Sequence, residues 1–145
     1  MHRILVVANE TLAGRRLLDE IERRVDGRDA QVHVVCPALN SRLRHWLSDE
    51  DGAREAAEAR LAASLATLSE LGIDASGAIG DADPVQAIDD ALCSFEADEV
   101  IVSTHPPGRS NWLEKDVPER AKRFELPLTH VVVDLEAEIG ARTAA

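Results

Sequence analysis

Five short apolar runs, separated by segments with helical periodicity, constrain the fold of this chain more than any other feature. The runs cover residues 4–8, 31–36, 73–79, 100–103 and 128–133. Runs of this length, rich in Val and Ile, are typical of buried strands, and helices between successive strands indicate βαβ units with parallel strands. Because such crossovers are right-handed, we predict one α/β domain with a doubly wound, five-stranded parallel sheet in the order 3-2-1-4-5.

The segments between the strands carry helix start and stop signals. We predict a first helix with Thr11 as its N-cap, a long Ala-rich helix that stops at Gly72, and a third helix with Asp83 as N-cap and Pro84 as first residue. A last helix is expected over residues 112–124. The apolar faces of the first three helices are Leu12, Leu17, Leu18, Ile21 and Val25; Ala53, Ala57, Leu61, Leu65, Leu68 and Leu71; and Val85, Ile88, Leu92 and Phe95.

The composition fits a single domain and disfavours polyanionic partners. Over 145 residues, 27 acidic and 16 basic side chains give a formal charge of −11, and this field would repel nucleic acids and anionic membranes. Cys36 and Cys93 lack a CxxC spacing and fit reduced thiols of the cytosol, while a bridge between them stays open. No stretch approaches the roughly 20 apolar residues of a membrane span, and Asn9 interrupts the first apolar run too early for a signal peptide. We expect a cytoplasmic domain over residues 1–135 and a tail over 136–145.

Polar residues follow the strands at the carboxyl edge, where doubly wound proteins bind ligands. Asn9 follows the first strand, Gly80 and Asp81 follow the third, and a loop over residues 104–111 follows the fourth. These residue types are also ordinary in turns. The long loop leads into a helix N-terminus, where backbone N–H groups and the helix dipole favour anions. Two adjacent prolines in the loop lack the N–H groups of an amide cradle, so the question is whether a nucleotide still binds.

The chain resembles the universal stress protein family. The resemblance covers almost the whole chain and rests on the element order and on three motifs: Gly80-Asp81-Ala82-Asp83-Pro84, Ala97-Asp98 before the fourth strand, and Gly108-Arg109-Ser110 after it. It implies an α/β fold of the adenine-nucleotide-binding type, a dimer, a cytosolic location and ATP or AMP as ligand. The candidate cofactor-binding residues are Asn9, Gly80, Asp81, Thr104, His105, Gly108, Arg109 and Ser110.

The sequence departs from the pattern of the ATP-binding members of that family. Their acidic residue at the end of the first strand is replaced by Asn9, which can still hydrogen-bond a base or ribose. Their loop pattern Gly-x2-Gly-x9-Gly-Ser/Thr is reduced to Gly108, with Thr104 at the expected first glycine. If Asn111 caps the next helix, Glu114 completes a capping box and places a carboxylate beside the amides that a phosphate would use. We therefore predict weakened or lost ATP binding.

The sequence carries few residue patterns that are typical of a catalytic site. His105 is a candidate general base, but no acidic partner at a suitable spacing orients it. Cys36 would be a reactive thiol only if it faced the cleft, and a buried, inert cysteine is the reading that we favour. The other histidines, His2, His33, His45 and His130, are scattered, so no metal site is predicted.

The last strand bears on assembly because it should lie at an edge of the sheet. Residues 128–134 include three consecutive valines and neither Lys nor Pro, the residues that guard exposed edges. We predict a homodimer through this strand, with residues 135–139 folding back over the edge as the alternative.

Two hypotheses of function remain open. The preferred one is a non-enzymatic stress-response module that acts through dimerisation or a protein partner. The alternative is an adenine-nucleotide-binding protein with slow ATPase activity, which uses Asn9, Gly80, Asp81, Arg109 and Ser110 in a rearranged site. A third reading is a site for another adenylated or phosphorylated small molecule.

Overall fold

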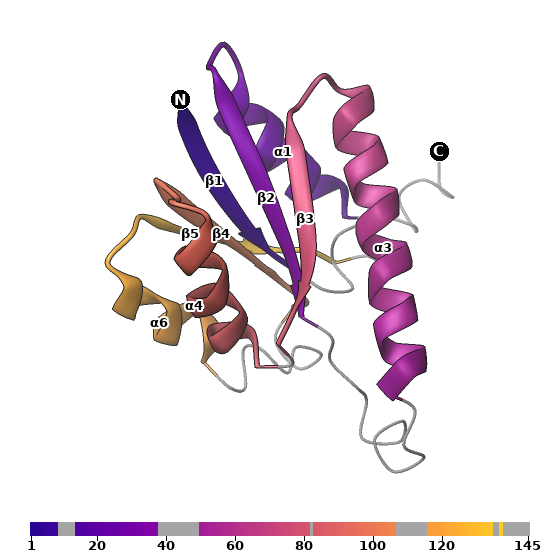
Figure 1. Ribbon diagram of the computed structural model, residues 1–145. Helices are drawn as coiled ribbons and strands as arrows, with labels where there is room; N and C mark the ends of the chain where they lie inside the picture. Colours follow the sequence, from indigo (N-terminus) through magenta and orange to yellow (C-terminus); the bar gives the residue numbers. More distant parts are fainter. Residues whose placement is uncertain (9–13, 38–49, 82, 107–115, 135–136, 138–145) are drawn as a thin grey trace.

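Five parallel strands form the centre of the molecule in the order β3-β2-β1-β4-β5, as predicted (Figure 1). The computed structural model describes residues 1–8, 14–37, 50–81, 83–106, 116–134 and 137, without the side chains of residues 50, 51 and 53. The strands are β1 (His2–Val7), β2 (Ala30–Pro37), β3 (Ala75–Gly80), β4 (Glu99–Thr104) and β5 (Leu128–Val132). The helices are α1 (Arg15–Val25), α3 (Glu50–Glu70), α4 (Pro84–Ser94), α6 (Val117–Ala121) and the 3-10 turn η2 (Lys122–Phe124).

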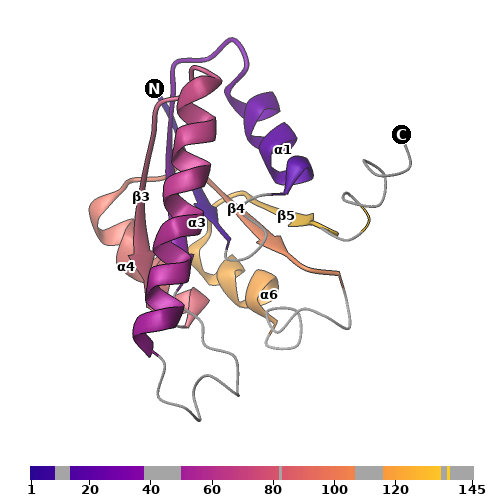
Figure 2. The same cartoon turned by 90° about the vertical axis from the view of Figure 1, so that its right-hand side faces the viewer.

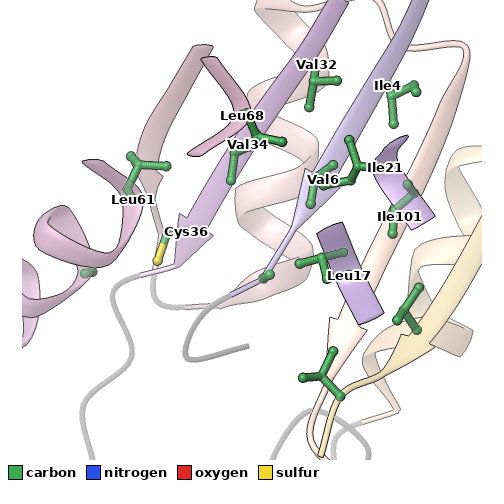
Figure 3. Close-up of a cluster of buried hydrophobic side chains, with 14 residues drawn as sticks. Ile4, Val6, Leu17, Ile21, Val32, Val34, Cys36, Leu61, Leu68 and Ile101 are labelled. Carbon is green, nitrogen blue, oxygen red and sulfur yellow. The ribbon is translucent and has the colours of Figure 1, made fainter. Parts of the chain in front are cut away.

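Helices cover both faces of the sheet. Helices α1 and α3 pack on one face and α4 and α6 on the other, as the two views at right angles show (Figures 1 and 2). Side chains alternate between the faces along β1, because Ile4 and Val6 join the cluster under α1 and α3, whereas Leu5 and Val7 join the cluster under α4 and α6. Figure 3 shows the first cluster, including Leu17, Ile21, Leu61 and Leu68 from the helices. In the described part of the chain no helix has the length and apolar character needed to cross a membrane.

Two glycines let helices approach β3 from opposite sides. A Cβ atom at Gly77 would lie 2.7 Å from Leu61 Cδ1 of α3, and one at Gly80 would lie 2.8 Å from Ala87 Cβ of α4. Real Cβ contacts are essentially never so short, so a side chain at either position would force a neighbour to shift; Leu61 can move the flexible end of its side chain, whereas the Cβ of Ala87 cannot move without its backbone.

The predicted ends of α3 and α4 are confirmed. Asp83 is the N-cap of α4, its Oδ1 accepts from the N–H of Val85 at 3.0 Å, and Pro84 opens the helix. Gly72 follows α3 with a φ of 78°, a left-handed conformation that glycine adopts without strain. The predicted buried face of α4 is also found: Val85, Ile88 and the C-cap Phe95 lie in the core, and Leu92 packs against it partly buried.

Three predictions about the helices were wrong: the start of α1, the position of Leu71 and the extent of the last helix. Helix α1 begins at Arg15 with Gly14 as N-cap, three residues after Thr11, which itself lies outside the described residues. Leu71 is not part of the buried face of α3, because it follows the last helical residue and is 47% exposed.

The last helix is also not continuous over residues 112–124. Asp116 has a φ of 54°, and α6 starts at the next residue, followed by η2. The physical reason is Pro118: without an N–H, and with a ring that clashes with the preceding turn, proline is accommodated only in the first turn of a helix.

Candidate ligand site at the carboxyl edge

The carboxyl ends of β3 and β4 hold the four candidate residues that the structure describes: Gly80, Asp81, Thr104 and His105. The other candidates, Asn9, Gly108, Arg109 and Ser110, lie outside the described residues. The predicted cap by Asn111 and Glu114 lies outside them as well.

The four described candidates lie along one edge in two separate pairs. Gly80 pairs with Pro37 of β2, and Thr104 pairs with Val132 of β5. Strands β2 and β1 separate β3 from β4, so the pairs are three strand spacings apart, or about 14 Å. A ligand that touched both pairs would therefore have to span the ends of four strands.

The first pair is engaged in local structure. Gly80 faces α4, and Ala87 of that helix and Val35 of β2 occupy the space that a side chain would need. Asp81 Oδ1 accepts from the N–H of Asp83 at 2.9 Å, and this turn presents Asp83 to the helix N-terminus. The Asp83 carboxylate also lies 3.6 Å from Arg120 of α6. The N-terminus of α4 thus carries its own anion, which disfavours a second one there.

The second pair includes a buried hydroxyl with an unexpected partner. Thr104 is 2% exposed, and its Oγ1 lies 2.8 Å from Nε2 of His130 on β5. Desolvation lowers the pKa of His130 and favours the neutral ring, whose Nε2 donates to or accepts from the Thr104 hydroxyl according to its tautomer. His105 follows directly and is half-buried. His130 was not predicted as a neighbour of Thr104, because the contact depends on the register of β4 and β5, in which both positions face the same side of the sheet.

The cysteines are not in a disulfide. Neither Cys36 nor Cys93 takes part in a disulfide, so the bridge left open above does not form. Cys36 is fully buried at the end of β2, and burial raises the pKa of its thiol while the nearby Arg60 of α3 acts in the opposite direction. A buried thiol with a raised pKa is a poor nucleophile. This agrees with the prediction that Cys36 is a buried, inert cysteine.

The Ala97-Asp98 motif has a structural role at the opposite edge of the sheet. Asp98 Oδ2 accepts from the N–H of Arg3 at 2.8 Å, and the N–H of Asp98 donates to the carbonyl of Arg3 at 2.8 Å. These two bonds align the starts of β1 and β4. The motif therefore supports the central strand pair rather than the ligand edge.

Comparisons with known proteins find similarity in structure alone. No protein-family model matches the sequence, and no curated protein matches it. A universal stress protein family protein from Arabidopsis thaliana, solved with AMP bound, superposes with a TM-score of 0.65 at 10% identity, covering 94% of this chain and 95% of the other. A family protein from Burkholderia pseudomallei gives a TM-score of 0.62 at 16% identity, with 89% and 94% covered.

A third similar structure comes from the same family. The universal stress protein from Archaeoglobus fulgidus gives a TM-score of 0.62 at 14% identity, with 92% of this chain and 98% of the other covered. Together with the strand order and the paired helix layers, these matches over nearly the full length of each chain show that this protein has the fold of the universal stress proteins.

Proposed function

We propose that this chain is a universal-stress-protein-like regulatory module of the cytoplasm, without enzymatic activity, in which ATP binding is weakened or lost. The observation that carries the proposal is the contact between Thr104 and His130. Thr104 stands at the start of the loop over residues 104–111, and its buried hydroxyl already has a partner inside the protein. A ligand would have to displace His130 to use it, at the expense of an existing hydrogen bond.

The charges around the first pair support the same proposal. Asp81 and Asp83 are exposed at the end of β3, and Asp83 occupies the N-terminus of α4. A triphosphate placed at this end of the edge would meet carboxylates at close range, and like charges in one site repel. Arg120 is already beside Asp83 and is less available to a phosphate.

The alternative, an adenine-nucleotide-binding protein with slow ATPase activity, is favoured by one observation. The Arabidopsis protein of the same fold was solved with AMP bound. AMP carries a single phosphate, so it would meet less repulsion than ATP from Asp81 and Asp83. Asn9, Arg109 and Ser110 would then supply its contacts.

A ligand titration separates these functions. The purified protein is titrated with ATP, ADP and AMP, each with and without Mg²⁺, by thermal shift and calorimetry, because a ligand that binds the native state raises its stability. We expect no saturable response at millimolar ATP. A saturable response to ATP that Arg109→Ala removes, while Arg54→Ala on the outer surface of α3 preserves it, would overturn the proposal in favour of the nucleotide-binding alternative.

We also propose that the module is a homodimer paired through β5. The strand order leaves two edges, β3 and β5. Asp74 and Asp81 flank β3, so antiparallel pairing of two β3 strands in full register would place these carboxylates opposite each other. Residues 127–133 carry no Asp, Glu, Lys or Arg in a chain with 30% charged residues. Two copies therefore bring no such like charges together at β5.

The C-terminal tail is the alternative cover for that edge. Ala137 has a helical backbone, and its N–H donates to Asp134 Oδ1 at 3.1 Å, which is a helix-capping contact directly after the strand. The other residues of 135–139 lie outside the described part of the chain, and the mass in solution distinguishes the tail from a second copy as the cover of β5.

The mass in solution tests the dimer. Sedimentation equilibrium should give twice the 15.7 kDa chain mass. Val132→Lys places a guarding charge on the β5 edge and should give monomers, whereas Ala78→Lys, at an exposed position of the other edge strand, should leave the mass unchanged. A monomeric wild type, or dissociation by Ala78→Lys alone, would overturn this assignment.

A further inference from the structure

We propose that His130 makes the pairing of two β5 strands sensitive to pH, so that the dimer dissociates on acidification. This inference rests on the homodimer proposed above. Neither the sequence patterns nor the comparisons assign a role to His130. Its protonation would add pH regulation to the proposed β5 interface.

The position of His130 in the strand carries the first step. Strand β5 comprises five residues, Leu128–Val132, and His130 is the middle one. Antiparallel pairing of two identical strands about a two-fold axis in full register places the middle residue opposite its own copy. Directly opposite side chains have Cβ atoms about 5 Å apart. Two imidazole rings would therefore face each other at the centre of the interface.

The surroundings of His130 carry the second step. The side chain is exposed in the single chain, and its hydrogen-bond partner is the Thr104 hydroxyl. A hydroxyl both donates and accepts, so this bond holds the ring in place whether or not it is protonated. The α1 side of β5 is separate, because Arg24 of that helix donates to Thr129 on the opposite face of the strand.

The charged groups of α6 and η2, the described elements next to this face, are engaged elsewhere. Helix α6 contacts β5, and its Arg120 lies beside Asp83, while its Glu119 pairs with Lys122 at the start of η2. Arg123 of η2 stacks on Phe124. Among the contacts that the structure describes, no carboxylate pairs with His130, so a second positive charge at the axis would lack compensation. His105, adjacent to Thr104, is the other titratable ring at this end of β4.

The direction of the pH effect follows from proton linkage. Desolvation lowers the pKa of His130 already in the single chain. Pairing would bury the ring further and place a like charge opposite it, so the dimer binds protons less readily than two monomers. The dimer dissociation constant should then rise as the pH falls. Each of the two rings contributes a factor of about ten for every unit by which pairing lowers its pKa.

Sedimentation equilibrium at about pH 8 and about pH 5.5 tests the inference on the full chain. We expect the wild type to be dimeric at the higher pH and to dissociate at least about tenfold more readily at the lower pH. His130→Gln should remain dimeric at both, and His33→Gln, a matched change in the inner strand β2, should behave as the wild type. Circular dichroism at both pH values confirms that the chains stay folded.

The possible outcomes separate the inference from the dimer itself. A wild type that is monomeric at the higher pH overturns the dimer, and the inference with it. A wild type that is dimeric at both pH values, or a pH dependence unchanged in His130→Gln, overturns the inference and leaves the dimer standing. If the His130 variant does not fold, NMR titration of the wild-type histidines decides: the His130 pKa must be lower at protein concentrations that favour the dimer, and an equal pKa at both concentrations overturns the inference.

Discussion

Arg24 of helix α1 donates from Nη1 to Oε1 of Glu99 at 2.7 Å and so joins the helix to the start of β4. The same guanidinium donates to Thr129 of β5 at 2.7 Å and to Glu20 at 2.9 Å. Glu99 is 5% exposed and also contacts His2 of β1 through a hydrogen bond. One side chain therefore compensates a buried carboxylate and connects α1 with two strands at the amino edge of the sheet.

Removal of this guanidinium should be strongly destabilising. Arg24→Met keeps the aliphatic stem but leaves Glu99 buried with His2 alone, and loss of one partner of a buried pair costs about 3 kcal/mol or more. Arg54→Met removes an exposed pair with Glu58 and should cost less than about 1 kcal/mol. Urea denaturation of both variants measures the difference. Equal losses would show that Arg24 acts only as a surface residue.

Gly80→Ala should destabilise through overpacking. The new Cβ would lie 2.8 Å from Ala87 Cβ and 2.9 Å from Val35 Cγ1, and overpacking of this kind costs about 1–3 kcal/mol. In the double variant with Ala87→Gly the two losses should be less than additive, because space is restored opposite the new methyl group. Additive losses in thermal or urea unfolding would contradict the packing role of Gly80.

The N-cap of α4 should depend on a side-chain oxygen rather than on charge. Asp83→Ala removes the acceptor for the N–H of Val85 and should cost about 1 kcal/mol, whereas Asp83→Asn keeps a good cap and should stay within about 0.5 kcal/mol of the wild type. The contact with Arg120 at 3.6 Å is exposed and contributes little. A loss in Asp83→Asn as large as in Asp83→Ala would show that the ion pair dominates; chemical denaturation decides.

Stability should fall as the pH drops below about 6.5, in part because of His33. Desolvation lowers the pKa of this ring from 6.5, where it accepts or donates a hydrogen bond with Ser76 at 2.9 Å and stacks on Phe95. The unfolded chain then binds the proton more readily than the native state, so the free energy of unfolding rises with pH in the window below the unfolded pKa.

The same free energy measured from about pH 8 to about pH 5.5 checks this effect. His33→Gln should flatten the slope, while Ser76→Ala, which removes the partner but keeps the titrating ring, should preserve most of it. A slope unchanged in His33→Gln would assign the pH dependence to other groups, such as His130, whose pKa is also lowered by desolvation.

Local patterns in the sequence determined the secondary structure and the class of the fold. The five apolar runs coincide with the five strands, most clearly at β1 and β4, because a strand buried on both faces needs an uninterrupted apolar segment. Asp83-Pro84 and Gly72 marked helix ends correctly, because capping involves residues within one turn of each other. The error at the last helix was also local, since Pro118 already limits where α6 can begin.

Only the tertiary structure decided which residues contact one another across the fold. Thr104 and His130 are 26 positions apart, and Arg24 and Glu99 are 75 apart, so their contacts depend on strand register and helix placement that no short pattern encodes. Gly80 is predicted as a ligand contact, and the approach of α4 to β3 gives it a packing role that the sequence did not indicate. The physical reason is the same in each case: hydrogen bonding and burial act over a few ångströms in space, whatever the separation along the chain.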